Sequence, residues 1–292
     1  MAVAEAGPPA HPWIAGARPR TLPAAVVPVL VGTAAASPHV VAWRAVAALV
    51  VALAFQVGVN FANDYSDGVR GTDADRIGPV RLVASGLASP ERVKLAAVGS
   101  LAVACAAGSA LALAVDWRLF AVGAAAALAA WGYTGGPRPY GYAGMGELFV
   151  FVFFGLVATC GSAYVELHRV PPLAAVCAVP VGLLAVALLA ANNLRDLPKD
   201  AVAGKRTLAV MLGERRARGM LAGCLALPFP LAAAVAAWHP FALVALASLP
   251  LAVRPLMSVL EGSRGAEMVA VLGATARLQL AYGLALAVGL LL

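Results

Sequence analysis

The stretch Asn60–Asp73, NFANDYSDGVRGTD, comes directly after a long apolar run. At 100° per residue, a helix places Asn60, Asp64 and Asp67 on one face, and Asn63 is an i, i+4 neighbour of Asp67. Carboxylates that share a face at the C-terminal end of a helix repel each other and oppose the helix dipole. The stretch therefore predicts a bound cation at the end of a membrane-length helix.

A second stretch, Asn192–Thr207, has a similar composition, NNLRDLPKDAVAGKRT, and also follows an apolar run. Asn193, Asp196 and Asp200 fall on one helical face. The likeness between the two stretches predicts a weak internal repeat, which is common in membrane folds. A helical bundle can bring two such helix ends together over one cavity. Pro198 is expected to disturb the second helix, because proline is poorly tolerated in a helix interior.

Two acidic clusters of this kind favour a hard divalent cation, and Mg2+ typically binds one or two carboxylates together with substrate phosphates. We predict two Mg2+ ions and a diphosphate, whose remaining negative charge is balanced by basic side chains. Ordinary solvated loop charges are the alternative, but two matched clusters fused to apolar helices disfavour it. The predicted metal ligands are Asp64, Asp67, Asp196 and Asp200, and the predicted basic partners are Arg81, Arg195, Lys205 and Arg206.

Composition places the whole chain in a membrane. Of its 292 residues, 62% are hydrophobic and only 12% are charged, whereas soluble domains carry about 25% charged residues. The apolar runs are continuous rather than alternating, which indicates helices and not a barrel. We predict an all-α integral membrane protein with one domain over residues 1–292 and a mobile tail over 1–12. Nine spanning segments are predicted, at residues 21–37, 44–63, 93–115, 118–134, 146–166, 171–192, 216–236, 239–258 and 268–291.

The distribution of basic residues predicts the orientation. With a cytoplasmic N-terminus, the outside loops keep only Arg44, Arg118 and Arg169, and nearly all other Lys and Arg residues lie inside. Arg greatly outnumbers Lys, a bias that often accompanies a GC-rich bacterial genome, so we expect a bacterial plasma membrane. The net charge of +7 is explained by this orientation. No basic helix with interleaved aromatic residues is present, so nucleic acid is not expected as a partner.

Five stretches together resemble the UbiA superfamily of intramembrane aromatic prenyltransferases over nearly the whole chain. Within it, the likeness is greatest to the branch that prenylates 1,4-dihydroxy-2-naphthoate in menaquinone biosynthesis. Relatives often carry a third Asp four residues after the second, where this chain has Gly71. The stretches are ARPRTLPAA at Ala17–Ala25, NDYSDGVRGTD at Asn63–Asp73, GPVRLVASG at Gly78–Gly86, YTGGPRPYGYAGMGE at Tyr133–Glu147 and NNLRDLPKDAVAGKRTL at Asn192–Leu208.

The resemblance implies a nine-helix bundle with a cytoplasmic active site that depends on Mg2+. It implies that a long isoprenoid passes from a polyprenyl diphosphate to 1,4-dihydroxy-2-naphthoate, with loss of carbon dioxide and diphosphate. The lipid bilayer is the expected environment. The diphosphate would lie at Asn60, Asn63, Arg76, Arg81, Asn193, Arg195, Lys205 and Arg206, and the acceptor at Arg18, Tyr65, Asp73, Tyr133, Tyr142 and Glu147. The expected catalytic residues are Asp64, Asp67, Asp196, Asp200 and Lys205.

Several alternatives stay open at this point. Arg18 either pairs with the acceptor carboxylate or anchors the chain at the membrane edge. Tyr133, Tyr140 and Tyr142 either face a developing cation or belong to an interfacial aromatic belt. Glu147 either acts on the acceptor or is an ordinary charge at a helix start. The acceptor itself could be 4-hydroxybenzoate, homogentisate, a porphyrin or a glycerol phosphate. A secondary transporter is the alternative class, but it would carry isolated acids deep inside its helices.

Overall fold

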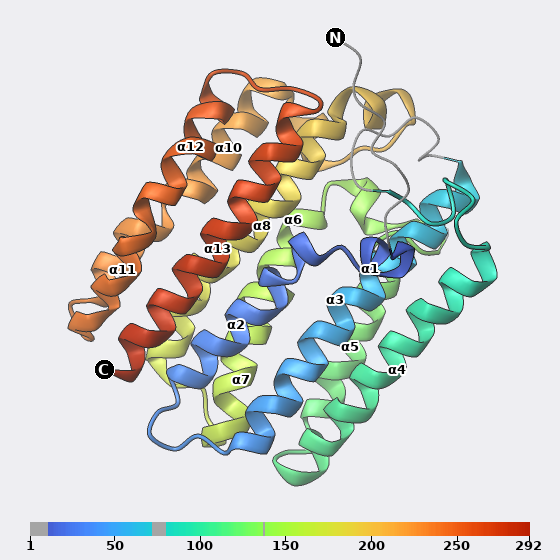
Figure 1. Cartoon of the computed structure of the whole chain (residues 1–292). Helices are drawn as coiled ribbons and strands as arrows, with labels where there is room; N and C mark the ends of the chain where they lie inside the picture. Colours follow the sequence, from blue (N-terminus) through green and yellow to red (C-terminus); the bar gives the residue numbers. More distant parts are fainter. Residues whose placement is uncertain (1–10, 72–79, 137) are drawn as a thin grey trace.

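A computed structural model of the chain describes residues 11–71, 80–136 and 138–292, and over these residues it is all-helical, with no strand. Figure 1 shows the helices packed side by side as one bundle. The elements are α1 Pro12–Ala17, η1 Pro19–Thr21, α2 Pro23–Ala34, α3 Ala42–Arg70, α4 Pro90–Ala114, α5 Leu119–Gly132, η2 Tyr140–Ala143, α6 Gly146–Val150, η3 Phe151–Val157, α7 Ala158–Leu167, α8 Pro172–Val202, α9 Leu208–Leu212, α10 Glu214–Ala226, α11 Pro228–Val235, η4 Pro240–Ser248, α12 Leu249–Leu260 and α13 Glu267–Leu291.

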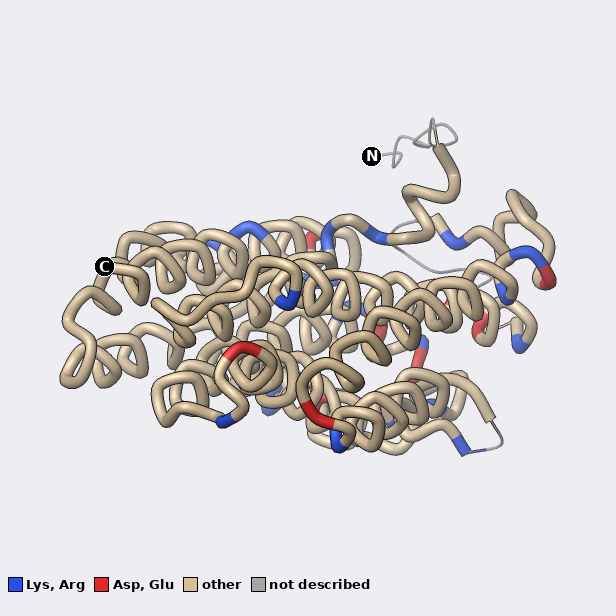
Figure 2. Tube along the Cα trace, turned by 90° about the horizontal axis from the view of Figure 1, so that it is seen from below, with Lys and Arg blue, Asp and Glu red and all other residues tan. Residues whose placement is uncertain are grey.

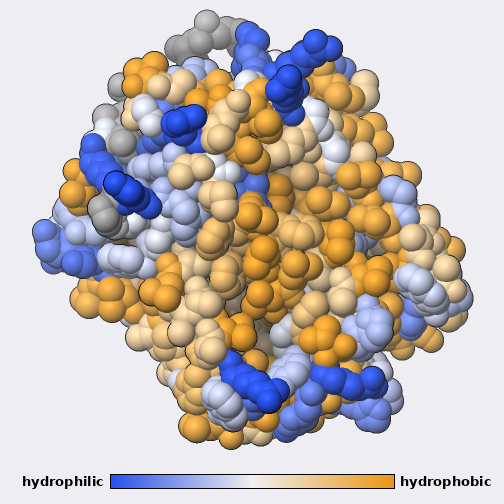
Figure 3. All heavy atoms as spheres, turned by 180° about the vertical axis from the view of Figure 1, so that it is seen from behind, coloured by the Kyte–Doolittle hydropathy of each residue, from blue (hydrophilic) through white to orange (hydrophobic). Residues whose placement is uncertain are grey.

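Seven helical segments among the described residues are long and apolar enough to cross a bilayer. The two remaining predicted spans correspond to the shorter apolar helices α2 and α5. The all-helical membrane fold is confirmed, whereas the count of nine spans and the orientation stay predictions. Charged residues are few along the trace (Figure 2), and the face in Figure 3 is largely hydrophobic across its middle with hydrophilic groups toward its ends. Such a surface suits a bilayer.

Two helices extend well beyond the predicted apolar spans, and they carry the acidic stretches. α3 continues to Arg70 and ends at Gly71, whose φ of 72° lies in the left-handed region that glycine adopts without a Cβ penalty. α8 continues to Val202 and passes through Pro198 without ending. Residues beyond the predicted apolar spans therefore lie on helix ends, where their spacing along the helix controls which side chains point together.

Close helix contacts at small residues hold the bundle together. The largest core cluster joins α2, α8, α10, α11 and α13, and its members are mainly Ala, Val and Leu. Gly32 of α2 lies against α7: a Cβ on this glycine would stand 2.1 Å from the Thr159 carbonyl oxygen. Small residues of this kind let helix backbones approach closely in membranes, where packing replaces the hydrophobic effect between helices.

Replacing Gly32 by Ala should lower the free energy of unfolding by about 1–3 kcal/mol, because a backbone carbonyl cannot yield and α2 must move away from α7. Thermal unfolding in detergent measures the effect. Gly99→Ala in α4 is the matched control, since nothing lies within 4 Å of a Cβ there. Equal unfolding temperatures for the two variants would contradict this packing.

Candidate active site

The two acidic stretches face one cavity of about 360 Å³ inside the bundle. Asp67 of α3 and Asp196 and Asp200 of α8 line its polar end. Asp67 Oδ1 accepts a bond of 3.2 Å from Lys205 Nζ, although these residues are 138 positions apart in the chain. This ion pair joins the end of α3 to the segment after α8. The ends of α3 and α8 therefore meet at one cavity, as predicted.

Asp67 is the centre of the polar end. Its carboxylate accepts from the Tyr142 hydroxyl and Lys205 Nζ on one oxygen, and from Arg81 Nη2 at 3.4 Å on the other. The Lys205 ammonium also stands 4.6 Å from the centre of the Tyr142 ring. Burial, together with the Asp67 carboxylate, raises the pKa of the Tyr142 phenol, so that the phenol stays protonated and donates. Two cations and one hydroxyl thus hold this carboxylate at the cavity.

The cavity lining differs from the predicted one at two positions. From α3, Asn60, Asn63 and Asp67 line the cavity and Asp64 does not. From α8, the predicted Asn193, Asp196 and Asp200 line it together with Asn192. Asn192 was not among the predicted site residues, although it lies four residues before Asp196, just as Asn63 lies four residues before Asp67. Asn63 Oδ1 accepts from the Thr134 hydroxyl at 2.7 Å.

Asp64 has a different environment from Asp67. It is 1% exposed and is not among the residues lining the cavity. Its Oδ2 accepts from Leu82 N at 2.8 Å, and its Oδ1 accepts from Val83 N at 3.0 Å. Both oxygens therefore hold the backbone directly after Arg81. The predicted ligand role of Asp64 stays a prediction, while its observed contacts position the segment that carries Arg81.

In the second stretch, Arg195 forms a bidentate ion pair with Asp196. The Arg195 Nε and Nη2 atoms each donate at 2.7 Å to a different oxygen of Asp196. Arg195 is 5% exposed and does not line the cavity, so its contact to the cavity runs through Asp196. A carboxylate has about four lone-pair sites, so this fork leaves acceptor capacity on Asp196. Lys199, which was not predicted as a site residue, does line the cavity.

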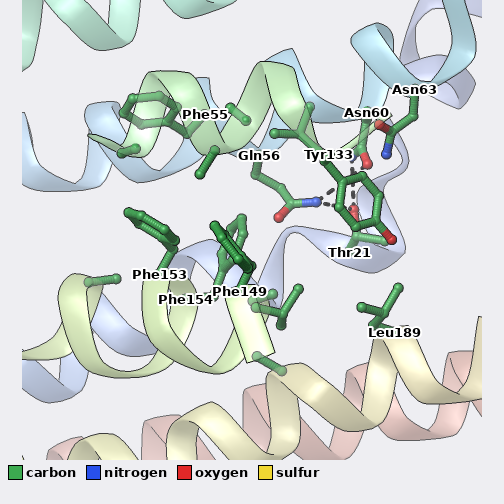
Figure 4. Close-up of a pocket in the computed structure, with 18 of the residues that line it drawn as sticks. Thr21, Phe55, Gln56, Asn60, Asn63, Tyr133, Phe149, Phe153, Phe154 and Leu189 are labelled. Atoms are coloured by element: carbon green, nitrogen blue, oxygen red, sulfur yellow. Dashed lines mark hydrogen bonds between the residues drawn. The ribbon is translucent and has the colours of Figure 1, made fainter. Parts of the chain in front are cut away.

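The segment before α2 closes one side of the polar end. Thr21 Oγ1 receives hydrogen bonds of 2.9 Å from Gln56 Nε2 and from Asn60 Nδ2, and donates to the Arg18 carbonyl oxygen. Figure 4 shows these side chains joined by dashed lines. Arg18 adopts a positive φ of 54° and lines the cavity. The Asn60 side chain thus links the N-terminal segment to α3 through its hydrogen bond to Thr21. Thr21 and Gln56 were not predicted.

Several predicted acceptor and phosphate residues lie around or outside the cavity. Tyr133 lines the cavity. Asn193 Nδ2 donates to Glu147 Oε1 at 2.8 Å, and of these two residues Asn193 lines the cavity and Glu147 does not. The Tyr65 ring lies under Lys94 Nζ, at 5.6 Å, away from the lining residues. Arg206 is exposed and does not line the cavity. The predicted residues Asp73 and Arg76 lie outside the described residues.

The donor set suits Mg2+ with a phosphate ligand. Among the described residues, no three His, Cys, Asp or Glu side chains stand together as a complete metal site. Instead, aspartates from α3 and α8 line one cavity together with Asn63 and Asn192. Mg2+ binds through one or two carboxylates plus phosphate oxygens and waters rather than in an all-protein cage. The residues present therefore fit a metal that arrives with a phosphorylated ligand.

The rest of the cavity is apolar. It is lined by Phe55 of α3, by Phe149, Phe153 and Phe154 of α6 and η3, and by small residues of α5. Figure 4 shows these phenylalanines apart from the Thr21–Gln56–Asn60 network. η3 is a π-helical segment, and such segments are frequent at functional sites. The lining runs along α3 from Ala48 to Asp67, which is about 28 Å at 1.5 Å per residue.

Comparisons with known proteins show the family of the chain. The sequence model of the UbiA prenyltransferase family matches residues 25–272. A 1,4-dihydroxy-2-naphthoate octaprenyltransferase of Mycobacterium tuberculosis is 50% identical over 277 residues, covering 94% of this chain and 95% of that protein. The enzyme of the same name from Escherichia coli is 41% identical over 216 residues, 70% of each chain.

Solved structures show the same fold. A UbiA homolog from Archaeoglobus fulgidus bound to DMAPP and Mg2+ has a TM-score of 0.61 at 17% identity, covering 94% of this chain and 99% of that one. The apo structure of a UbiA homolog from Aeropyrum pernix has a TM-score of 0.67 at 16% identity, covering 92% and 96%. At these identities the likeness concerns the fold.

Proposed function

The chain belongs to the UbiA prenyltransferase family, and we propose that it prenylates 1,4-dihydroxy-2-naphthoate. A polyprenyl group leaves its diphosphate as the allylic C–O bond breaks, and a C–C bond forms to the naphthoate ring. The ring carboxylate departs as carbon dioxide, the diphosphate is released, and the product is the hydroquinone form of demethylmenaquinone. The names of relatives that are 50% and 41% identical support this acceptor. The basic loops support an active site that faces the cytoplasm.

One observation carries the proposal: the Asp67–Lys205 pair brings two aspartate-bearing helix ends to the mouth of a cavity whose remainder is apolar. A prenyl diphosphate has the same division between a highly charged head and a long hydrocarbon tail. Lys205 and Arg81 stand at Asp67 and supply positive charge to a diphosphate there. Preorganised charge of this kind stabilises the leaving group as its negative charge grows.

Mg2+ fits the same end. Asp67, Asp196 and Asp200, with the amide oxygens of Asn63 and Asn192, would hold it. When bound, Mg2+ supplies positive charge against the leaving diphosphate. Arg195 and Tyr142 keep Asp196 and Asp67 in place through their hydrogen bonds. The chain's contribution is thus to present aligned carboxylates from two rigid helices.

The apolar end orients the prenyl tail and excludes water. A lipid tail that leaves the bilayer gains little from burial, so the wall of Phe55, Phe149 and Phe153 acts mainly by shape. Water exclusion protects an electron-poor allylic carbon from hydrolysis. Arg18 lines the polar end and offers a guanidinium to the carboxylate of the acceptor, since Arg pairs with carboxylates in a bidentate manner.

Purified protein should form a prenylated, decarboxylated naphthohydroquinone, detected as the quinone after oxidation in air, from 1,4-dihydroxy-2-naphthoate and a long-chain prenyl diphosphate. EDTA should abolish this turnover until Mg2+ is restored. Product analysis by mass spectrometry measures it. 4-Hydroxybenzoate and homogentisate, supplied in parallel, test the acceptor. Turnover with either of these and not with the naphthoate would discard the proposed acceptor but keep the prenyl transfer. Undiminished turnover in EDTA would contradict the metal.

A further inference from the structure

A second cavity, of about 450 Å³, lies between η1, α12 and α13. Its lining combines three arginines with hydroxyl groups and small residues. Arg20 comes from the same short segment as Arg18, so this cavity stands at the end of the bundle that also carries the aspartates. Its polar lining consists of Arg20, Arg254, Ser258, Ser263, Glu267 and Arg277.

Two of the three arginines belong to membrane-length helical segments. Arg277 is ten positions into α13, which places its Cα about 15 Å from the helix start. Its guanidinium returns toward that start, because a Cβ on Gly273 would meet Arg277 Nη1 at 3.9 Å. Arg254 lies six positions before the end of α12. A charged group at such depth is costly, and it generally marks a functional contact.

These arginines have no acidic counterpart in the described part of the chain. No carboxylate forms an ion pair with Arg20, Arg254 or Arg277 there. Glu267 is the one acid in the lining, and its Oε2 accepts from the Arg264 backbone at 3.2 Å. Neighbouring arginines at this end of the bundle behave otherwise, since Arg218 and Arg264 both pair with Glu214. The cavity therefore presents an excess of positive charge to a ligand.

We propose that this cavity binds the phosphate headgroup of an anionic phospholipid. Arg277 stands at the top of an exposed stripe on α13 whose members follow at helical spacing: Leu280, Leu284, Val288 and Leu291. The stripe runs toward the other end of the bundle, as an acyl chain would beneath a headgroup held by Arg277. Basic pockets between helices at a membrane edge are suited to anionic lipid headgroups. A free phosphate would gain nothing from the stripe.

Binding to full-length protein in neutral detergent, followed by native mass spectrometry, tests the site. The probes are phosphatidylglycerol, phosphatidylcholine of the same chain length, and glycerol 3-phosphate, a soluble glycerol phosphate without acyl chains. We expect phosphatidylglycerol to bind at least tenfold more tightly than either of the other two. Arg277→Gln and Arg254→Gln should each weaken phosphatidylglycerol binding about tenfold. Arg92→Gln is the matched control, an exposed arginine at the same end of the bundle, and should bind as wild type.

Several results would overturn the proposal. These are equal binding of phosphatidylglycerol and phosphatidylcholine by the wild type, or wild-type binding by both Arg277→Gln and Arg254→Gln. Glycerol 3-phosphate binding as tightly as phosphatidylglycerol would replace the lipid by a soluble phosphate ligand. Should Arg277→Gln unfold, Arg277→Lys keeps the charge and should retain most of the binding. Arg277→Gln should keep prenyl transfer in detergent within about twofold, so failure of the lipid site and of the proposed reaction are told apart.

Discussion

Replacing Asp67 by Asn should lower turnover by about 10³-fold or more, and Asp196→Asn should do the same. Asp67 touches Tyr142, Arg81 and Lys205, and it is the point where the two aspartate-bearing helix ends meet. Removing its charge takes a counter-charge away from the Lys205 and Arg81 cations and removes a ligand from the proposed metal. Asp196→Asn likewise breaks the bidentate fork from Arg195.

The measurement is product formation at saturating Mg2+ and prenyl diphosphate, with folding checked by thermal unfolding. Asp116→Asn is the control, because Asp116 lies in the connection between α4 and α5 and accepts from the Tyr164 hydroxyl, away from the cavity lining. It should retain near-wild-type turnover. An Asp67→Asn protein that turns over within tenfold of wild type would remove this carboxylate from the mechanism.

Asp64→Asn should also lose activity, by about 10²-fold, but for a different reason. Its carboxylate accepts from the backbone N–H groups of Leu82 and Val83, directly after Arg81. An amide offers one acceptor where two are needed, so one buried N–H loses its partner, at a cost of about 1–3 kcal/mol. The segment then shifts, and Arg81 moves away from the cavity. The protein should unfold at a lower temperature than wild type.

A Mg2+ titration separates the two aspartates. If Asp64 positions Arg81, the Mg2+ concentration for half-maximal turnover stays near the wild-type value in Asp64→Asn, while it rises strongly in Asp67→Asn. Arg81→Gln should reproduce the kinetic loss of Asp64→Asn without its loss of stability. A Mg2+ requirement raised equally in Asp64→Asn and Asp67→Asn would instead make Asp64 a metal ligand, as its sequence position predicts.

Hydropathy and the two acidic stretches were sufficient to predict an all-helical membrane bundle with aspartates gathered at one cavity. The prediction succeeded because continuous apolar runs have few stable solutions in a bilayer. It was weakest where hydropathy alone defines an element. α2 and α5 are apolar like their neighbours but are shorter helices. Conversely, α3 and α8 extend past their apolar parts to Arg70 and Val202, where polar residues continue the helix into the site.

Individual roles within the acidic stretches depended on what packs against them. At 100° per residue, Asp64 and Asp67 lie only about 60° apart around α3, so spacing predicts a shared face for both. Asp67 faces α8 and Lys205, and Asp64 faces the segment that follows Arg81. Likewise, Asn192 and Asn193 are adjacent and both line the cavity, but Asn193 donates to Glu147 while Asn192 donates to the Leu188 carbonyl oxygen.

By itself, the sequence determined that the chain lies in a bilayer, that it is all-helical, and which chemical type of site it carries. These properties follow from composition and from local spacing along a helix. The tertiary structure decided which carboxylate meets which cation, since Asp67 and Lys205 are 138 residues apart and no local pattern records that contact. It also decided that Arg20, Arg254 and Arg277 share a cavity. Such meetings depend on how helices pack, and packing depends on the shapes of many side chains at once.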